Sequence, residues 1–481
     1  MAALLRAQDC GRAVGLADLE NEARPVGLEE ATRGPPRTCL TSCARKDFDA
    51  WMRFRPVPIS GALACLALLA GCESLAPRYQ NPSAGAPISV QNKPGYSLAF
   101  VEFGEQGSYL DTSQIEAAVK LVRATPKPLV ITYVHGWHNN VKSDDVGRFS
   151  KFLSEVSDTP LIRGKGFHVI GVYLGWRGEI TDVPAIRQLT FYSRKAAAER
   201  LASNFDCFDA ISSIAEAARR HRRREAQYTI LLGHSFGGLV VERAVAHAID
   251  AEMHGRSRRG NSMPADLALV LNPASDSILS RQIISALYQE KTERARPLFV
   301  SITSAADSAT GTWFPIGTSF AAVTKAFNQV VDPGKPDKKE TERHFFTTTP
   351  GHNPSLVNHV ARKLDQPFTP PPGLSALEIN LSRVLSGDTV ALPGANGIEL
   401  WHLDRVSKLD VPYWDVQVDR SIIKDHGDIW NERAKALMAG VFSIANPISK
   451  RGGRHEADLQ KPREFRRDAY KQDAIAAPPK N

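Results

Sequence analysis

The chain has 481 residues, of which 42% are hydrophobic and 23% are charged, and it carries a formal net charge of +8. This composition is that of a globular protein, and it excludes a disordered or collagen-like chain. The length is better explained by one large domain with appended segments than by two equal domains.

A basic and then apolar segment precedes the first globular pattern. Arg53 and Arg55 are followed by an apolar run over residues 57–70, which ends in Leu-Ala-Gly-Cys at Cys72. The run is too short to span a bilayer, and its flanks match those of a secretory signal peptide. This ending resembles the bacterial lipoprotein signal, which implies that Cys72 is acylated and becomes the first residue of the mature chain. A buried helix of the domain is the alternative interpretation of the same run.

If the protein is exported, its N-terminal region is expected to consist of three parts. Residues 1–51 are expected to be a wrongly assigned or disordered extension, residues 52–71 the lipoprotein signal peptide, and residues 72–96 a tether rich in Pro, Ser, Gly and Asn. The protein is then expected in the bacterial cell envelope, lipid-anchored at the periplasmic face of the outer membrane. Of the six cysteines, Cys72 and Cys207 remain in the mature chain, so no internal disulfide is expected, and Cys207 is predicted to be a buried apolar residue.

Two clusters hold much of the positive charge, at residues 219–224 and 450–480. In an exported protein these clusters favour a solvated helix end or attraction to anionic lipid over nucleic-acid binding. No cysteine and histidine spacing typical of a zinc site is present, so no metal is expected.

Beyond residue 97, apolar strand-like runs alternate with segments of helical spacing. The predicted strands are 98–103, 129–134, 167–174, 228–232, 267–271, 298–303 and 413–418. The predicted helices are 113–123, 146–156, 186–224, 236 to about 252, 278–292 and 428–438. This alternation predicts an α/β domain over residues 97–440, with a mostly parallel central sheet and helices on both faces.

Residues 308–412 interrupt the alternation. This segment is rich in Pro, Gly and Thr, with modest helical patterns at 320–330 and 374–385, and it is expected to form a lid-like insertion before the last strand. Residues 441–481 are charged and are expected to form a mobile tail.

A serine lies at the turn between one predicted strand and the next helix. The segment Gly233-His234-Ser235-Phe236-Gly237 follows the apolar run 228–232 and precedes a helical pattern. Small residues two positions before and after Ser235 let the neighbouring backbone approach closely in a strained turn. The pentapeptide alone is a weak motif, and its position between strand and helix makes it informative.

Three other predicted strands are also followed by polar or reactive groups. Trp137 lies in His-Gly-Trp-His-Asn-Asn after strand 129–134, Asp307 follows strand 298–303, and His426 follows strand 413–418. The turns after parallel strands meet at one edge of a sheet, so these groups are expected near Ser235.

The order serine, acid, histidine resembles that of the α/β-hydrolases of the serine esterase and lipase type, over residues 98–438. The segment Tyr-Val-His-Gly-Trp-His-Asn-Asn is similar to one in a subgroup of bacterial proteins known only as hydrolases. The resemblance implies an α/β-hydrolase fold in which Ser235 is the nucleophile, His426 the general base and Asp307 the acid that orients it. It also implies an oxyanion hole formed by the backbone N–H groups of Phe236 and Trp137.

Several residues compete for these roles. Asp276, after strand 267–271, is the alternative acid. The alternative bases are His344, His352, His359 and His402. His135 is expected to shape the oxyanion loop through hydrogen bonds, whereas Trp176 either lines the pocket or packs in the core.

The sequence therefore predicts a serine hydrolase that cleaves carboxylic esters through an acyl-enzyme intermediate, without a cofactor. Its expected partners are a small-molecule or lipid ester and a membrane reached through the lipid anchor, with no nucleic acid. The pattern leaves the oligomeric state open. An acyltransferase with the same three residues and a non-catalytic envelope protein on a hydrolase fold are the alternatives.

Overall fold

The structure is a computed structural model, and it describes residues 89–180, 190–219, 228–253, 263–287, 297–332, 335–363, 390–391, 397–402 and 412–445. The chain divides into two compact units, residues 1–70 and 71–481, and every described residue belongs to the second. The expected extension, the expected signal peptide, Cys72, the predicted helix 374–385, residues 220–224 of the first basic cluster and everything beyond residue 445 lie outside the described residues.

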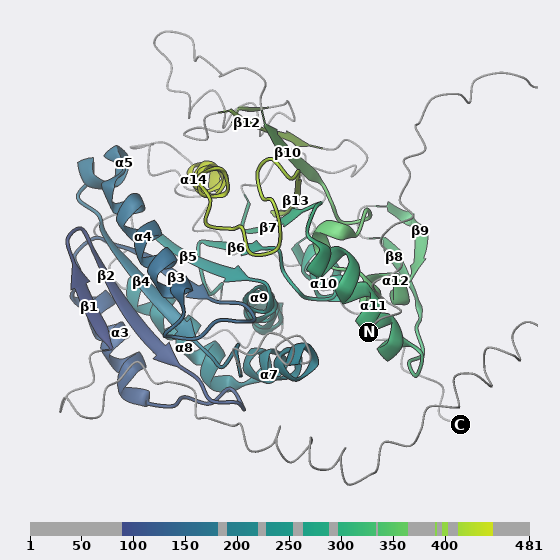
Figure 1. Ribbon diagram of the computed structural model, residues 1–481, viewed down its shortest axis with the longest axis horizontal. Helices are drawn as coiled ribbons and strands as arrows, with labels where there is room; N and C mark the ends of the chain where they lie inside the picture. The colour runs from purple at the N-terminus through teal and green to yellow at the C-terminus, as the bar shows by residue number, and fades with distance from the viewer. Residues whose placement is uncertain are drawn as a thin grey trace, which may run out of the picture. The chain divides into compact units, whose positions relative to one another are not determined.

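The core of the described part is an 11-stranded sheet, and a two-stranded sheet lies apart from it (Figure 1). The strand order of the large sheet is β1-β2-β4-β3-β5-β6-β7-β13-β10-β12-β11. Its strands are β1 (Val90–Lys93), β2 (Tyr96–Glu102), β3 (Pro128–Val134), β4 (His168–Gly175), β5 (Tyr228–His234), β6 (Leu267–Leu271), β7 (Phe299–Ser304), β10 (His359–Lys363), β11 (Val390–Ala391), β12 (Ile398–His402) and β13 (Tyr413–Val418). The small sheet pairs β8 (Gln329–Asp332) with β9 (Lys335–Thr341).

From β2 to β10 every neighbouring pair in the sheet is parallel, and the antiparallel pairs lie at its two ends. The expected mostly parallel sheet is confirmed. The central strands β3 and β5 are buried along their whole length. This explains why their sequences are continuous apolar runs rather than alternating ones, because both faces of the sheet are covered.

Helices cover both faces of the sheet. One apolar cluster joins the sheet to α3, α7, α8, α9 and α10, and a second joins its other face to α4, α5 and α14. The helices are α3 (Thr112–Ala124), α4 (Asp144–Asp158), α5 (Pro160–Gly164), α7 (Phe191–Ser203), α8 (Phe205–Arg219), α9 (Phe236–Met253), α10 (Ser277–Leu287), α11 (Phe314–Ala322), α12 (Glu342–Thr347) and α14 (Glu432–Ala445). None of the described helices is both long and apolar enough to cross a bilayer.

The long helical region expected over 186–224 is two helices in the structure. Asn204 follows the last residue of α7 with an extended backbone, and its side-chain oxygen accepts a hydrogen bond of 2.9 Å from the N–H of Asp206 in the first turn of α8. Asparagine favours such helix ends because its short amide bonds to free backbone groups. Cys207 on α8 is buried, as predicted.

The segment expected as a lid contributes partly to the sheet. β10 pairs with β13 in parallel, and β12 and β11 extend the sheet beyond β10. Within the same segment, the helix expected at 320–330 is wrong in its position, because α11 ends at Ala322 and β8 begins at Gln329. α11 and α12 contact each other, and α12 contacts α10.

Candidate active site

Ser235 occupies the turn between β5 and α9 with a φ of 56°, which is rare for a residue with a side chain. Two glycines make this turn possible. A Cβ atom on Gly237 would lie 2.0 Å from the carbonyl oxygen of Val134, and one on Gly233 would lie 2.6 Å from the carbonyl oxygen of Gly237. The turn therefore packs directly against the end of β3, and only glycine fits at these two positions.

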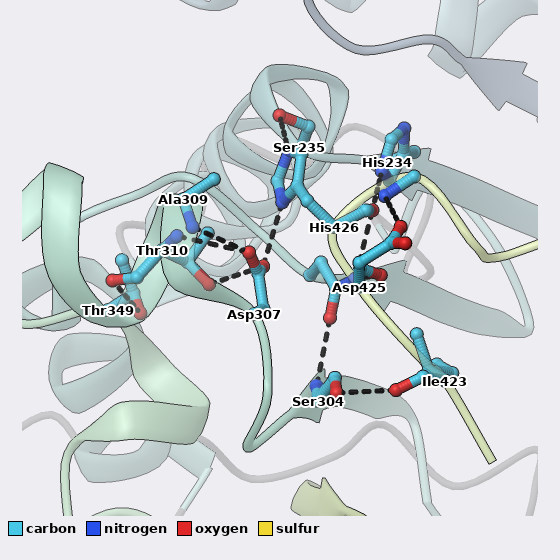
Figure 2. Close-up of polar contacts among 12 residues, drawn as sticks. His234, Ser235, Ser304, Asp307, Ala309, Thr310, Thr349, Ile423, Asp425 and His426 are labelled. Atoms are coloured by element: carbon cyan, nitrogen blue, oxygen red, sulfur yellow. Dashed lines mark hydrogen bonds and ion pairs between the residues drawn. The ribbon is translucent and has the colours of Figure 1, made fainter. Parts of the chain in front are cut away.

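The structure brings Ser235, His426 and Asp307 together in one hydrogen-bonded series, although they come from three separate strand ends (Figure 2). Nε2 of His426 lies 2.8 Å from Oγ of Ser235, and Nδ1 lies 2.7 Å from Oδ2 of Asp307. The carboxylate accepts from Nδ1–H, which leaves Nε2 free to accept the serine proton. Ser235 and Asp307 are buried, whereas the side chain of His426 is 27% exposed, so solvent reaches the series at the histidine.

Asp307 is buried, and its surroundings keep it ionised. Burial alone would raise its pKa, but the hydrogen bond and charge of His426, together with bonds from Thr310, lower the pKa below its ordinary value. The hydroxyl of Thr310 donates to Oδ2 at 2.5 Å, and the N–H of Ala309 donates to Oδ1 at 2.9 Å. The segment directly after Asp307 therefore folds back to stabilise its carboxylate.

The backbone of His426 is held by two side chains that the sequence did not single out for this purpose. Nδ2 of Asn272 donates to the carbonyl oxygen of His426 at 3.0 Å, and Nε2 of His234 lies 2.9 Å from the same oxygen. Asn272 also accepts a bond of 2.9 Å from the N–H of Ser304. Asn272 follows β6 with a φ of 44°, a conformation that asparagine adopts more readily than most residues. An asparagine at the end of a parallel strand next to the serine turn is therefore the sequence signal from which its role could have been predicted.

His234 is neutral. Burial and the neighbouring His426 lower its pKa to about 4, so it donates to the carbonyl of His426 through Nε2–H.

The turn after β3 lies against Ser235. A Cβ on Gly136 would come within 2.6 Å of the Cβ of Ser235, which places the backbone of Trp137 beside the serine turn. Phe236 is the first residue of α9, so its N–H precedes the hydrogen-bond ladder of that helix. The two backbone N–H groups expected to form the oxyanion hole thus belong to turns that are in contact.

His135 and Trp176 hold the turn after β3 in place through hydrogen bonds. Nδ1 of His135 bonds to the carbonyl of Gly136 at 2.9 Å, and Nε2 accepts from the N–H of Trp176 at 3.1 Å. The indole N–H of Trp176 donates to the carbonyl of His135 at 2.9 Å, and the two rings are stacked. Both side chains are buried, so they shape the loop and Trp176 packs in the core.

Asp276 and the alternative histidines lie in other environments. Burial raises the pKa of Asp276, and the charges of Arg243, Lys195 and Glu199 on α9 and α7 also act on it. Three of the histidines have described side chains, and their hydrogen-bond partners are other than Ser235: Asn353 for His344, Thr310 for His352 and Asn358 for His359. The side chain of His402 lies outside the described part.

No family model and no curated protein matches the chain. Among solved structures, phospholipase PlaB from Legionella pneumophila aligns at 9% identity and a TM-score of 0.24, over 50% of this chain and 48% of that one. An uncharacterized protein from Pseudomonas aeruginosa aligns at 10% identity and a TM-score of 0.25, over 72% and 52%. The aligned part thus spans about half the length of either solved chain.

Within the described residues, no group of three or more His, Cys, Asp and Glu side chains is arranged to bind a metal.

Proposed function

We propose that the protein is a serine hydrolase of the α/β-hydrolase type that cleaves carboxylic esters through an acyl-enzyme intermediate. The observation that carries this proposal is the series Ser235–His426–Asp307, with bonds of 2.8 and 2.7 Å. A serine hydroxyl is a poor nucleophile until a base within hydrogen-bond distance takes its proton. His426 is such a base, and the ionised Asp307 stabilises the imidazolium that forms.

In the proposed reaction, Oγ of Ser235 attacks the ester carbonyl while its proton moves to Nε2 of His426. The tetrahedral oxyanion accepts hydrogen bonds from the N–H groups of Phe236 and Trp137, each of which contributes about 3 to 4 kcal/mol in comparable sites. His426 then returns the proton to the departing alcohol. Water attacks the acyl-enzyme by the same route in reverse and releases the acid.

The expected location follows from the sequence. Acylation at Cys72 would hold residues 97–440 at the bacterial envelope through the tether, and this remains a proposal. Mass analysis of the processed protein tests it, since a mature chain that retains residues 1–71 would contradict acylation at Cys72.

Hydrolysis of a short-chain nitrophenyl ester tests the reaction. Ser235→Ala and His426→Ala should each abolish turnover, and a fluorophosphonate probe should label Ser235 alone. Ser275→Ala is the matched control, because Ser275 is a buried serine in the loop after the neighbouring strand β6. Undiminished turnover in the Ser235→Ala protein would reject the proposal, and an ester product formed with an added alcohol would point to acyl transfer instead.

A further inference from the structure

Four large apolar side chains are exposed in a row along η4 (Ala309–Trp313), α11 and Val323, the residue that follows α11. Trp313 is 61% exposed, Ile316 45%, Phe320 75% and Val323 76%. Their spacing of three, four and three residues places them on one face of a helix. We call this row the α11 stripe.

The opposite face of α11 is already used for packing. Phe314, Thr318 and Ala322 are buried there, and α11 contacts α12. The helix therefore carries apolar residues on both sides, although a surface helix ordinarily exposes polar residues. An exposed apolar patch of this kind marks a surface that binds something.

The stripe is connected to the candidate active site along the chain. Asp307 lies just before η4, and Ala309 and Thr310 at the start of η4 both donate hydrogen bonds to its carboxylate. Figure 2 shows these bonds beside the contact between Asp307 and His426.

Aromatic rings lead from the stripe to the serine turn. Gly317 on α11 lies against Tyr192, which is itself 61% exposed. The ring of Phe191 lies 5.3 Å from that of Tyr192, 5.2 Å from Trp137 and 5.3 Å from Phe236. A chain of apolar contacts thus links α11 to Trp137 and Phe236, the two residues whose N–H groups are proposed to bind the oxyanion.

The composition of the segment fits a lipid surface. No charged residue occurs from Ser308 to Thr324, and the stripe combines Trp and Phe with aliphatic side chains. Two lysines lie near the segment: Lys325 follows it directly and lies over the ring of Phe346, and Lys195, which is paired with Glu199, lies over the ring of Phe314. Helices that lie in the membrane interface combine such an apolar face with flanking basic residues that attract anionic lipid.

The tether expected over residues 72–96 overlaps the domain, because Val90–Lys93 form β1 and pair with β2. The length of chain from Cys72 to the domain bears on the docking. Cys72 precedes Ser89, the first described residue, by 17 residues. A chain of that length spans at most about 60 Å when fully extended. If Cys72 is acylated, Ser89 remains within that distance of the bilayer.

We propose that the α11 stripe docks on a lipid bilayer and directs the acyl ester of a membrane lipid toward Ser235. The substrate class rests on the proposed hydrolase function, whereas the docking itself does not. The bilayer would then hold the protein at two points, the anchor at Cys72 and the α11 stripe.

Vesicle binding tests the docking. The full chain is used with Cys72→Ala, which removes the acyl anchor, and with Ser235→Ala, which prevents turnover. Co-sedimentation is measured with vesicles of phosphatidylcholine, with and without phosphatidylglycerol. Phe320→Asp and Val323→Asp should each weaken partitioning about tenfold or more, because each removes a large apolar side chain from the lipid contact.

Phe205→Asp is the matched control. Phe205 is 74% exposed, close to the 75% of Phe320, but it lies at the start of α8. Its replacement should change partitioning by less than about twofold. Trp313→Phe should bind vesicles as its parent does. It should lack the blue shift of tryptophan fluorescence that proteins with Trp313 show when they bind.

Activity separates this proposal from the function itself. The proteins for this assay keep Ser235 and carry Cys72→Ala. In this background, Phe320→Asp should release fatty acid from vesicles about tenfold more slowly than the Cys72→Ala parent. It should hydrolyse a soluble ester at the same rate as that parent, which also shows that it is folded. Vesicle binding without hydrolysis of any ester would reject the function and keep the docking. Equal partitioning of the Phe320→Asp and parent proteins, or a concentration-dependent dimer that Phe320→Asp dissociates, would overturn the docking.

Discussion

Asp307 and Glu242 are carboxylic acids that the fold removes almost completely from solvent, yet their surroundings shift their pKa values in opposite directions. Burial raises the pKa of Glu242 to about 7, and the hydroxyl of Ser280, which donates to Oε1 at 2.9 Å, offsets only part of this shift. Asp415 on β13 is its acidic neighbour, and burial together with Glu242 raises the pKa of Asp415 well above its ordinary value.

The difference lies in the partners. Asp307 faces His426, Thr310 and Ala309, which all donate to its carboxylate, whereas neither Glu242 nor Asp415 forms an ion pair with a cation of the described part. Burial by itself favours the neutral acid, and only suitably placed donors keep a buried carboxyl charged. The carboxylate that can stabilise an imidazolium is thus distinguished by its contacts rather than by its depth.

The largest expected effect comes from removing the charge of Asp307. Asp307→Asn keeps the shape of the side chain, but its amide cannot hold His426 in the tautomer that accepts the serine proton. The kcat for a soluble ester should fall by about 10⁴-fold, as in other sites of this geometry.

Asp276→Asn is the control for that substitution, since Asp276 is the alternative acid and lies among charges on α7 and α9. Its kcat should stay within a few-fold of that of the unmodified protein. A larger loss from Asp276→Asn than from Asp307→Asn would contradict the assignment of the acid.

Glu242→Gln should change how stability depends on pH. The pKa of Glu242 is about 7 in the folded protein and about 4.5 when unfolded, so its contribution is present below pH 4.5 and is lost as pH rises to 7. The free energy of unfolding falls by about 3 kcal/mol over this pH range, and a glutamine side chain, which does not ionise, avoids this loss. Denaturant titrations give the free energy of unfolding of the parent and the variant at pH 5 and at pH 8. From pH 5 to pH 8, the variant should gain about 2 to 3 kcal/mol relative to the parent.

The exposed Glu432 at the start of α14 provides the comparison for Glu242. A lysine partner, Lys435, lowers the pKa of Glu432, so Glu432→Gln should leave the stability change between pH 5 and pH 8 as it is. An equal pH dependence in Glu242→Gln and the parent would show that Glu242 is ionised in the folded protein.

The sequence predicted the central sheet well because its strands are buried on both faces. The run 267–271 coincides with β6 and 413–418 with β13, and the adjacent turns bring Ser235 and His426 to the same edge. The strand β10 was missed because its sequence, His-Val-Ala-Arg-Lys, is short and half polar. Its burial depends on β13 and β12, which are distant in sequence, and a local pattern does not carry that information.

The same limit applies within the site. Asp307 and Asp276 both follow a predicted strand and both lie between Ser235 and His426, so the sequence left Asp276 open as the alternative acid. The donors from Thr310 and Ala309, which distinguish Asp307, arise only when the next turn folds back. The bond from Asn272 to His426 joins residues 154 apart in sequence. Such contacts depend on the register of several strands and have no periodicity of their own.

The smallest expected effect concerns Asn272, which donates a hydrogen bond to the backbone carbonyl of His426. Asn272→Ala removes the bonds to His426 and Ser304, so the imidazole should sample other positions, and kcat should fall about tenfold with KM little changed. Asn358→Ala is the matched control, because Asn358 is also buried and bonds to two backbone groups, those of Tyr413 and Asp415. Both variants should lose stability, but only Asn272→Ala should lose kcat and react more slowly with a fluorophosphonate. An equal loss of kcat in both would mean that Asn272 acts through stability alone, and that the bond of Asp307 to the imidazole and the bond of His234 to the backbone carbonyl suffice to hold His426.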